Sequence, residues 1–233
     1  MAHDALVFDL DGTLTNSDPF HFAAFVEIGK DYGVEIDEQI FVDKISGHSN
    51  VEICRSLFGH IDSARHPAIA DDKEALFRRM LVGKLQPIPG LEALFAWAGA
   101  RRCGMALVTN APRLNVVDML KALNLDDRFD EIVLATELPR SKPDPLPYQT
   151  ALERLAVPAS RAVAFEDAVP GVQSASRAGI VTVGLSTTSA PEALEAAGAT
   201  LIIADYTAPG LLDRIGAVLD QRHDVQPATP AAP

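Results

Sequence analysis

Six short apolar runs recur along this chain, and most of them are separated by helix-like patterns. The runs cover residues 5–8, 105–108, 132–135, 162–165, 180–183 and 201–204, and each has the length of a strand. Between runs, apolar residues return at helical spacing, as at Leu114, Val117, Leu120 and Leu123, and at Tyr148, Leu152 and Leu155. Alternating strands and helices predict a parallel sheet covered on both faces. The expected fold is therefore α/β, with a doubly wound, Rossmann-like core.

The interval between the first two runs departs from this alternation. Helical spacing without a strand pattern is found in FHFAAFVEIGKDYGV, DEQIFVDKI, SNVEICRSLF and DKEALFRRMLVGKL. The segments TNSDP and QPIPG flank this interval and contain the Pro and Gly residues of linkers. We therefore predict a core of residues 1–16 plus 88–222, an inserted helical domain at 17–87, and a flexible tail at 223–233 that is poor in large apolar residues.

Charge and hydropathy exclude several classes of partner. The chain of 233 residues has 32 acidic and 20 basic side chains and a net charge of -12, so its field repels nucleic acids and anionic membranes. No apolar run approaches the roughly 20 residues that span a bilayer, and MAHDALVF lacks the basic region of a secretory signal. Cys54 and Cys103 have no paired or metal-type spacing. We expect a cytoplasmic protein.

Polar side chains follow several of the predicted strands. In an open parallel sheet, ligands bind outside the carboxyl ends of the strands. Residues at such ends, or in the adjacent loops, are Asp9, Asp11, Thr109, Asn110, Lys142, Glu166 and Asp167. Taken singly, several of these residues could equally cap a helix or lie on the surface. Together they predict one polar site at one edge of the sheet.

Asp9 and Asp11 are two residues apart, so their side chains point to the same side of an extended segment. Two carboxylates this close repel each other unless a cation lies between them. Mg²⁺ prefers hard oxygen ligands and leaves room for water and a phosphate oxygen, and Asp167 would add a third anionic ligand. With a metal present, one aspartate could attack phosphorus while its neighbour moves protons.

Three further residues suit the same phosphoryl chemistry. Thr109 can donate a hydrogen bond to a phosphoryl oxygen, and Lys142 can neutralise developing negative charge. Gly12 lets backbone N–H groups approach a phosphate closely.

The segments DLDGTLT, VTN, SKP and FEDAVPGVQSASRAG, in this order, resemble the four motifs of the haloacid dehalogenase superfamily. The helical insert directly after the first motif resembles the subfamily with an α-helical cap, which includes β-phosphoglucomutases and phosphoglycolate phosphatases. The resemblance implies that Asp9 is the nucleophile that forms an aspartyl-phosphate and that Asp11 is the general acid and base, with its backbone carbonyl on the metal.

The same resemblance implies roles for the other motif residues. Thr109 and Asn110 would contact the phosphate or substrate, Lys142 would stabilise charge, and Asp167 would bind Mg²⁺, with Glu166 acting on the metal directly or through water. Because the dehalogenases of this superfamily lack an aspartate at the position of Asp11, the resemblance favours phosphoryl transfer over dehalogenation.

Phosphatase and phosphomutase remain open on these motifs. His21 matches a histidine near the cap hinge that is found in the mutases and also in related phosphatases. Around Gly47 the mutases carry a lysine just before and an arginine three after, where this chain has Ser46 and Asn50, with His48 between them. A mutase needs such cations to hold a bisphosphate, so their absence favours a phosphatase.

Arg113 is a further candidate for substrate contact. The predicted function is a Mg²⁺-dependent phosphatase acting on a small phosphorylated metabolite, with a β-phosphoglucomutase-type mutase as the alternative. A receiver-like phospho-acceptor module fits less well, because the Asp9/Asp11 pair and the long insert are not typical of receivers.

Overall fold

Six parallel strands form the centre of the protein. The computed structural model describes residues 4–46 and 48–221. Within them the strands are β1 (Ala5–Phe8), β2 (Gly104–Thr109), β3 (Glu131–Leu134), β4 (Ala162–Glu166), β5 (Val181–Leu185) and β6 (Leu201–Ile203). They pair in the order β3-β2-β1-β4-β5-β6, always in parallel. The predicted strands and the predicted parallel sheet are confirmed, with small shifts at the strand ends.

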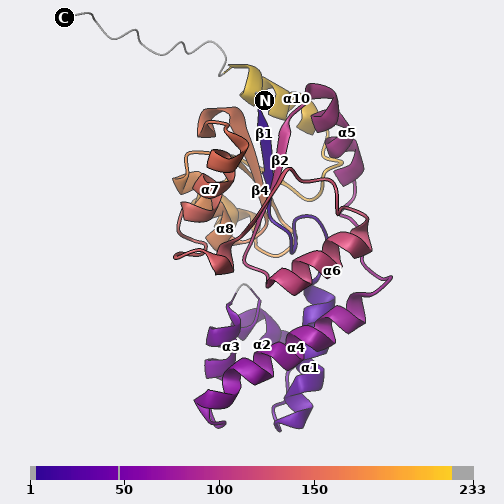
Figure 1. Ribbon diagram of the computed structural model, residues 1–233, viewed down its shortest axis with the longest axis vertical. Coiled ribbons are helices and arrows are strands. Elements are labelled where there is room, and N and C mark those ends of the chain that lie inside the picture. The colour runs from indigo at the N-terminus through magenta and orange to yellow at the C-terminus, as the bar shows by residue number, and fades with distance from the viewer. Residues whose placement is uncertain (1–3, 47, 222–233) are drawn as a thin grey trace, which may run out of the picture.

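Helices cover both faces of this sheet (Figure 1). Along β1, Leu6 and Phe8 join one apolar cluster, and Ala5 and Val7 join another on the opposite face. The first face packs against α5 (Leu91–Arg101), α6 (Arg113–Leu123) and α10 (Leu211–Gln221). The second packs against α7 (Leu146–Leu155) and α8 (Val169–Arg177), while α9 (Pro191–Ala197) contacts β5 and β6. The short 3-10 helices η2 (Ala135–Glu137) and η3 (Ala159–Arg161) lie in connections. The doubly wound α/β fold is therefore confirmed.

Helix α6 forms where the spacing predicts a helix, but a different face is buried. Leu114 and Val117 are 61% and 53% exposed. The buried apolar positions are Val116, Met119, Leu120 and Leu123. Two of the four predicted positions, Leu114 and Val117, therefore lie on the exposed face, because apolar residues occur on both faces of α6 and spacing alone does not rank them.

The chain segment that connects β1 to β2 forms four helices, which lie together at the bottom of Figure 1. They are α1 (Asp18–Asp31), α2 (Glu38–Lys44), α3 (Asn50–Leu57) and α4 (His66–Leu81), with the 3-10 helix η1 (Ser63–Arg65) before α4. We call α1–α4 the helical unit. Local sequence starts two of its helices: Asp37 accepts a hydrogen bond from the Ile40 N–H, and Ser49 and Glu52 form a capping box.

The helical unit has two small apolar clusters of its own, one around Phe25, Phe41 and Ile53 and another around Phe58 and Ile69. The predicted helices between the first two strands are thus confirmed. The exact limits 17–87 stay a prediction. The predicted tail at 223–233, the core limit at residue 222 and Gly47 lie outside the described residues.

Two chain segments join the helical unit to the sheet, and they lie side by side. The Ile88 N–H donates to the Leu14 carbonyl at 2.8 Å, and the Thr15 hydroxyl donates to the Gln86 carbonyl at 2.7 Å. Thr15 and Pro87 form an isolated antiparallel bridge. The chain therefore leaves and re-enters the core at one place.

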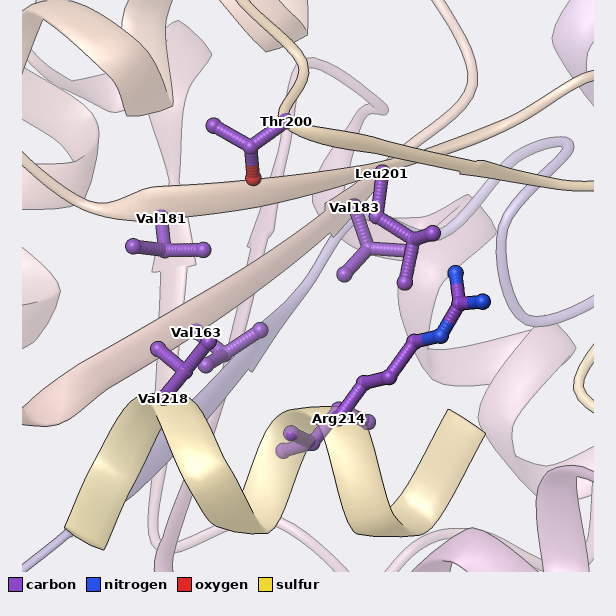
Figure 2. Close-up of a pocket in the computed structure, with 8 residues that line it drawn as sticks. Val163, Val181, Val183, Thr200, Leu201, Arg214 and Val218 are labelled. Atoms are coloured by element: carbon purple, nitrogen blue, oxygen red, sulfur yellow. The ribbon is translucent and has the colours of Figure 1, made fainter. Parts of the chain in front are cut away.

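An apolar cavity of about 310 Å³ lies between α10 and the sheet (Figure 2). It is lined by side chains from β4, β5, the start of β6 with the residue before it, and α10: Val163, Val181, Val183, Thr200, Leu201, Arg214, Ile215 and Val218. These positions precede the carboxyl ends of the strands, where the predicted site lies. No helix in the described ranges is long and apolar enough to cross a membrane.

Candidate active site

Two neighbouring strands, β1 and β4, bring the predicted acidic residues together. Asp9 directly follows β1, Glu166 is the last residue of β4, and Asp167 follows it. The register pairs Phe8 with Phe165, and the Asp9 N–H donates to the Phe165 carbonyl at 3.0 Å. Because the strands are parallel and in register, their polar continuations meet at one edge of the sheet.

Lys142 connects these carboxylates. Its Nζ atom donates to Asp9 Oδ1 at 2.6 Å, to Glu166 Oε1 at 2.6 Å and to the Val108 carbonyl at 2.7 Å. The side chain is buried, and its peptide bond to Pro143 is cis. Burial alone would lower the pKa of Lys142, but the charges of Asp9 and Glu166 outweigh burial and raise that pKa above its usual value. Lys142 is therefore a fixed positive charge beside Asp9.

Tyr148, which in the sequence belongs to a helical apolar pattern, is a further partner of this group. It lies on α7, is fully buried and donates its hydroxyl to Glu166 Oε1. Burial and the nearby carboxylates raise the pKa of Tyr148 well above its usual value, so the hydroxyl keeps its proton. A tyrosine at the apolar position of a helix that follows the Lys142 loop is the signal that could have identified it.

Asp9, Glu166 and Asp167 form a compact acidic cluster. Each offers a carboxylate oxygen, and these oxygens all lie within 4.8 Å of one another. Burial and then the Glu166 charge raise the pKa of Asp167 to about 8, although Thr188 and Thr13 donate hydrogen bonds to it. Burial, together with Glu166 and Asp167, raises the pKa of Asp9 against the opposing effect of Lys142. One lysine does not neutralise three buried carboxylates, and their oxygens are ligands that a divalent cation fits.

Two glycines allow this cluster to be so tightly packed. Gly12 has a φ of +77°, and a Cβ atom there would lie 2.0 Å from Asp167 Oδ2. A Cβ atom on Gly171 would lie 1.9 Å from Glu166 Oε2. Both positions therefore require glycine: Gly12 for its backbone conformation as well as for space, Gly171 for space.

The Asp11 carboxylate lies apart from the acidic cluster. Its Oδ1 atom accepts from the Ser17 hydroxyl at 2.5 Å and lies 3.5 Å from His21 Nε2. Burial raises the pKa of Asp11, but the hydrogen bond and charge of His21, the Ser17 hydroxyl and the charge of Lys73 outweigh it, so the pKa lies below its usual value. Its side chain remains about a third exposed and lines the cavity described next.

A cavity of about 800 Å³ lies between the carboxyl edge of the sheet and the helical unit. On the sheet side it is lined by Asp9, Asp11, Lys142, Glu166 and Asp167, and by Thr109 and Asn110. Thr109 is buried and accepts a hydrogen bond from the Ala111 N–H at 3.0 Å, while Asn110 is exposed to the cavity. The sequence-predicted residues at the strand ends thus share one cavity.

The helical unit provides the opposite wall. His21, His48 and Asn50 line it, together with Lys73 and Glu74 of α4, which sequence reasoning missed. Ile69, Lys73 and Phe77 are spaced by four on α4, so the missed signal is a pair of charged residues on the buried face of an amphipathic helix. Charged residues are rarely buried unless they are paired, so a buried Lys–Glu pair that lines a cavity indicates a role in that cavity rather than in apolar packing.

Arg113 is placed elsewhere. Its guanidinium forms a two-pronged ion pair with Glu137, with Nε–Oε1 at 2.9 Å and Nη2–Oε2 at 2.6 Å, and both side chains are largely exposed. Arg113 does not line the cavity. The predicted substrate contact by Arg113 is therefore not supported, because Glu137 on η2 draws its side chain away.

The comparisons with known proteins agree with this geometry. The family model described as haloacid dehalogenase-like hydrolase matches residues 6–185. The fructose-1-phosphate phosphatase of Escherichia coli is 30% identical over 179 residues, which cover 76% of this chain and 94% of that protein. The β-phosphoglucomutase of Bacillus subtilis is 29% identical over 192 residues, covering 78% of this chain and 82% of that protein.

Solved structures show the same fold. A haloacid dehalogenase hydrolase of family IA from Entamoeba histolytica superposes with a TM-score of 0.83 at 25% identity, covering 92% of this chain and 99% of that one. The site described above is an acidic cluster at the carboxyl edge of a doubly wound α/β sheet. The chain belongs to the haloacid dehalogenase-like hydrolase family, as its motifs predict, and is an enzyme.

Proposed function

We propose that this enzyme is a Mg²⁺-dependent phosphatase that hydrolyses a small phosphate monoester through an aspartyl-phosphate on Asp9. One observation carries the proposal: Asp9 lines a large cavity and forms an ion pair with Lys142 at 2.6 Å, and Glu166 and Asp167 of the acidic cluster lie beside it. The carboxylate is thereby held in one orientation toward the space that a substrate would fill.

Asp9, Asp167 and Glu166 would hold Mg²⁺, with the Asp11 backbone carbonyl as a further ligand. Bound there, the ion would supply positive charge to the phosphoryl oxygens and neutralise the repulsion among the carboxylates. Lys142 fixes one Asp9 oxygen and leaves the other to attack phosphorus. Thr109 and Asn110, at the end of β2, would orient the phosphoryl group.

Proton transfer falls to Asp11. Because its low pKa leaves Asp11 ionised at rest, Asp11 must first take up a proton to act as the acid. As the Asp9 oxygen bonds to phosphorus, the bond from phosphorus to the leaving oxygen breaks, and the protonated Asp11 gives that oxygen its proton. A water then attacks the aspartyl-phosphate, Asp11 takes a proton from it, and the bond between phosphorus and Asp9 breaks to release inorganic phosphate. The contacts of Asp11 with Ser17 and His21 hold the carboxyl group in place for both transfers.

The charges of the cavity wall favour a substrate whose leaving group is uncharged. Among the described residues that line the cavity, the lysines and arginines are Lys142 and Lys73, and each has a carboxylate partner, Lys73 in Glu74 at 2.9 Å. No unpaired cation in that set is available for a second phosphate or a carboxylate. We therefore favour a sugar phosphate or similar polyol phosphate, consistent with the fructose-1-phosphate phosphatase relative.

A β-phosphoglucomutase-type activity is the alternative, since one relative has that name. It requires a bisphosphate to be held and turned round in the cavity. Ser46 and Asn50 provide no positive charge for that task, which supports hydrolysis instead.

We further propose that residues 17–87 act as a cap that closes over the site, excludes water and selects the leaving group. We also propose that the enzyme acts in the cytoplasm.

The test is to measure phosphate release and sugar-phosphate isomer conversion side by side. The panel contains fructose 1-phosphate, β-glucose 1-phosphate and p-nitrophenyl phosphate, each with Mg²⁺ and with EDTA. We expect phosphate release that EDTA removes, and none from Asp9→Asn. Asp72→Asn, the same substitution at an exposed position of α4, is the matched control and should keep full activity. Conversion to the 6-phosphate with little free phosphate would show a mutase.

A further inference from the structure

Asn115 is a buried polar residue at the boundary between the core and the helical unit. It lies on α6, its residue is 2% exposed, and its side chain points to α4 of the helical unit. Its Nδ2 atom donates to Glu74 Oε2 at 2.6 Å, and its Oδ1 atom accepts from Arg78 Nη1 at 2.9 Å. Glu74 and Arg78 are four residues apart and so share one face of α4.

The two contacts together select an amide. An amide side chain carries a donor and an acceptor at its end, so it satisfies an anion on one side and a cation on the other. A carboxylate at this position would repel Glu74, and an apolar side chain would satisfy neither partner. We call the contacts of Asn115 with Glu74 and Arg78 the Asn115 bridge.

The bridge reaches the cavity through the second oxygen of Glu74. Glu74 Oε1 accepts from Asn50 Nδ2 at 2.8 Å and from Lys73 Nζ at 2.9 Å, and both of those residues line the cavity. Burial raises the pKa of Glu74, but Lys73, His21, Asn50 and Asn115 together bring that pKa below its usual value. Several groups thus keep Glu74 ionised and fixed, and among them Asn115 comes from α6, outside the helical unit.

We propose that Asn115 is a positioning residue: it holds the helical unit against the core and, through Glu74, fixes Asn50 and Lys73 where they meet the leaving group. Asn115 acts on the substrate only through Glu74. The inference rests on the proposed phosphatase function, because the leaving group it concerns is that of the phosphate ester.

The central variant is Asn115→Asp, which keeps the acceptor for Arg78 and replaces the donor to Glu74 by a second carboxylate. We expect kcat/KM for fructose 1-phosphate to fall roughly tenfold or more, the range for losing a hydrogen bond to a charged group. p-Nitrophenyl phosphate has an activated leaving group that depends less on the cavity wall, so kcat/KM for this substrate should fall clearly less. Asn124→Asp makes the same change at an exposed position just after α6 and should match the wild type.

A double variant separates positioning from general damage. In Glu74→Gln with Asn115→Asp, the amide and the carboxylate exchange places, so the hydrogen bond can re-form without a change in net charge. We expect most of the lost fructose 1-phosphate activity to return. A role in folding alone predicts equal losses on both substrates and no recovery, and that result would overturn the proposal. If Asn115→Asp does not fold, Asn115→Ser, which adds no charge, takes its place with the same substrate comparison.

A second measurement does not depend on turnover. Small-angle X-ray scattering should show a larger radius of gyration for Asn115→Asp than for Asn124→Asp, because the helical unit is released from the core. If the wild type hydrolyses nothing in the panel, the proposed function fails. The scattering comparison still tests whether the Asn115 bridge holds the helical unit against the core. Equal radii would count against it.

Discussion

Removing the Tyr148 hydroxyl should destabilise the fold by a predictable amount. Tyr148 is fully buried and donates its only hydroxyl proton to Glu166, an acceptor that also receives Lys142. Tyr148→Phe keeps the ring and leaves the carboxylate with one donor fewer. A hydrogen bond to a charged group contributes about 1.5–3 kcal/mol, and because Lys142 still satisfies Glu166, we expect a loss of about 2 kcal/mol.

Tyr206 provides a matched control. It is also buried, and its hydroxyl donates to a neutral acceptor, the Thr13 carbonyl, at 3.1 Å. Tyr206→Phe removes the same atom and should cost about 1 kcal/mol. For a chain of this size each kcal/mol lowers the melting temperature by about 2–4 °C, so we expect drops of roughly 4–8 °C for Tyr148→Phe and 2–4 °C for Tyr206→Phe.

The assay is urea denaturation followed by circular dichroism, with thermal melting as a second readout, both in EDTA so that bound metal does not contribute. The loss for Tyr148→Phe should be about twice that for Tyr206→Phe. Equal losses, or a Tyr148→Phe variant as stable as the wild type, would refute the view that Tyr148 stabilises a buried charge.

Three further outcomes are expected. Asp11→Asn should slow fructose 1-phosphate hydrolysis by roughly 100-fold or more while p-nitrophenyl phosphate, whose leaving group needs little protonation, is less affected; equal losses would contradict the acid role. Gly171→Ala should cost about 1–3 kcal/mol in urea denaturation, since its Cβ would lie 1.9 Å from Glu166, and a neutral result would show that Glu166 can move aside. Replacing His48 or Asn50 by Ala should reorder kcat/KM values across a sugar-phosphate panel, and an unchanged order would place specificity elsewhere.

The sheet and the strand-end residues could be predicted because local patterns and topology agree. A strand buried on both faces must be apolar throughout, as Ala5–Phe8 is, and a parallel sheet brings polar residues after its strands to one edge. That is why Asp9, Glu166 and Asp167, far apart in sequence, could be expected to meet.

The other wall of the cavity could not be predicted in the same way. The burial of Lys73 and Glu74 depends on how α4 packs against its neighbours, and from sequence a charged pair on a helix is normally assigned to solvent. Arg113 is the converse case: it follows a motif, but its partner Glu137, which holds it away from the cavity, lies on a 3-10 helix that no pattern placed beside it. Contacts between side chains from separate segments decide both cases.

The paired linkers at Leu14–Thr15 and Gln86–Ile88 have a consequence for how such proteins diversify. Because the core already holds both ends of the insert together, the chain entropy lost in closing that loop grows only with the logarithm of its length. Insertions, deletions or exchange of the helices between these ends therefore perturb the sheet little. The reaction chemistry and the choice of substrate can then change independently, each under its own selection.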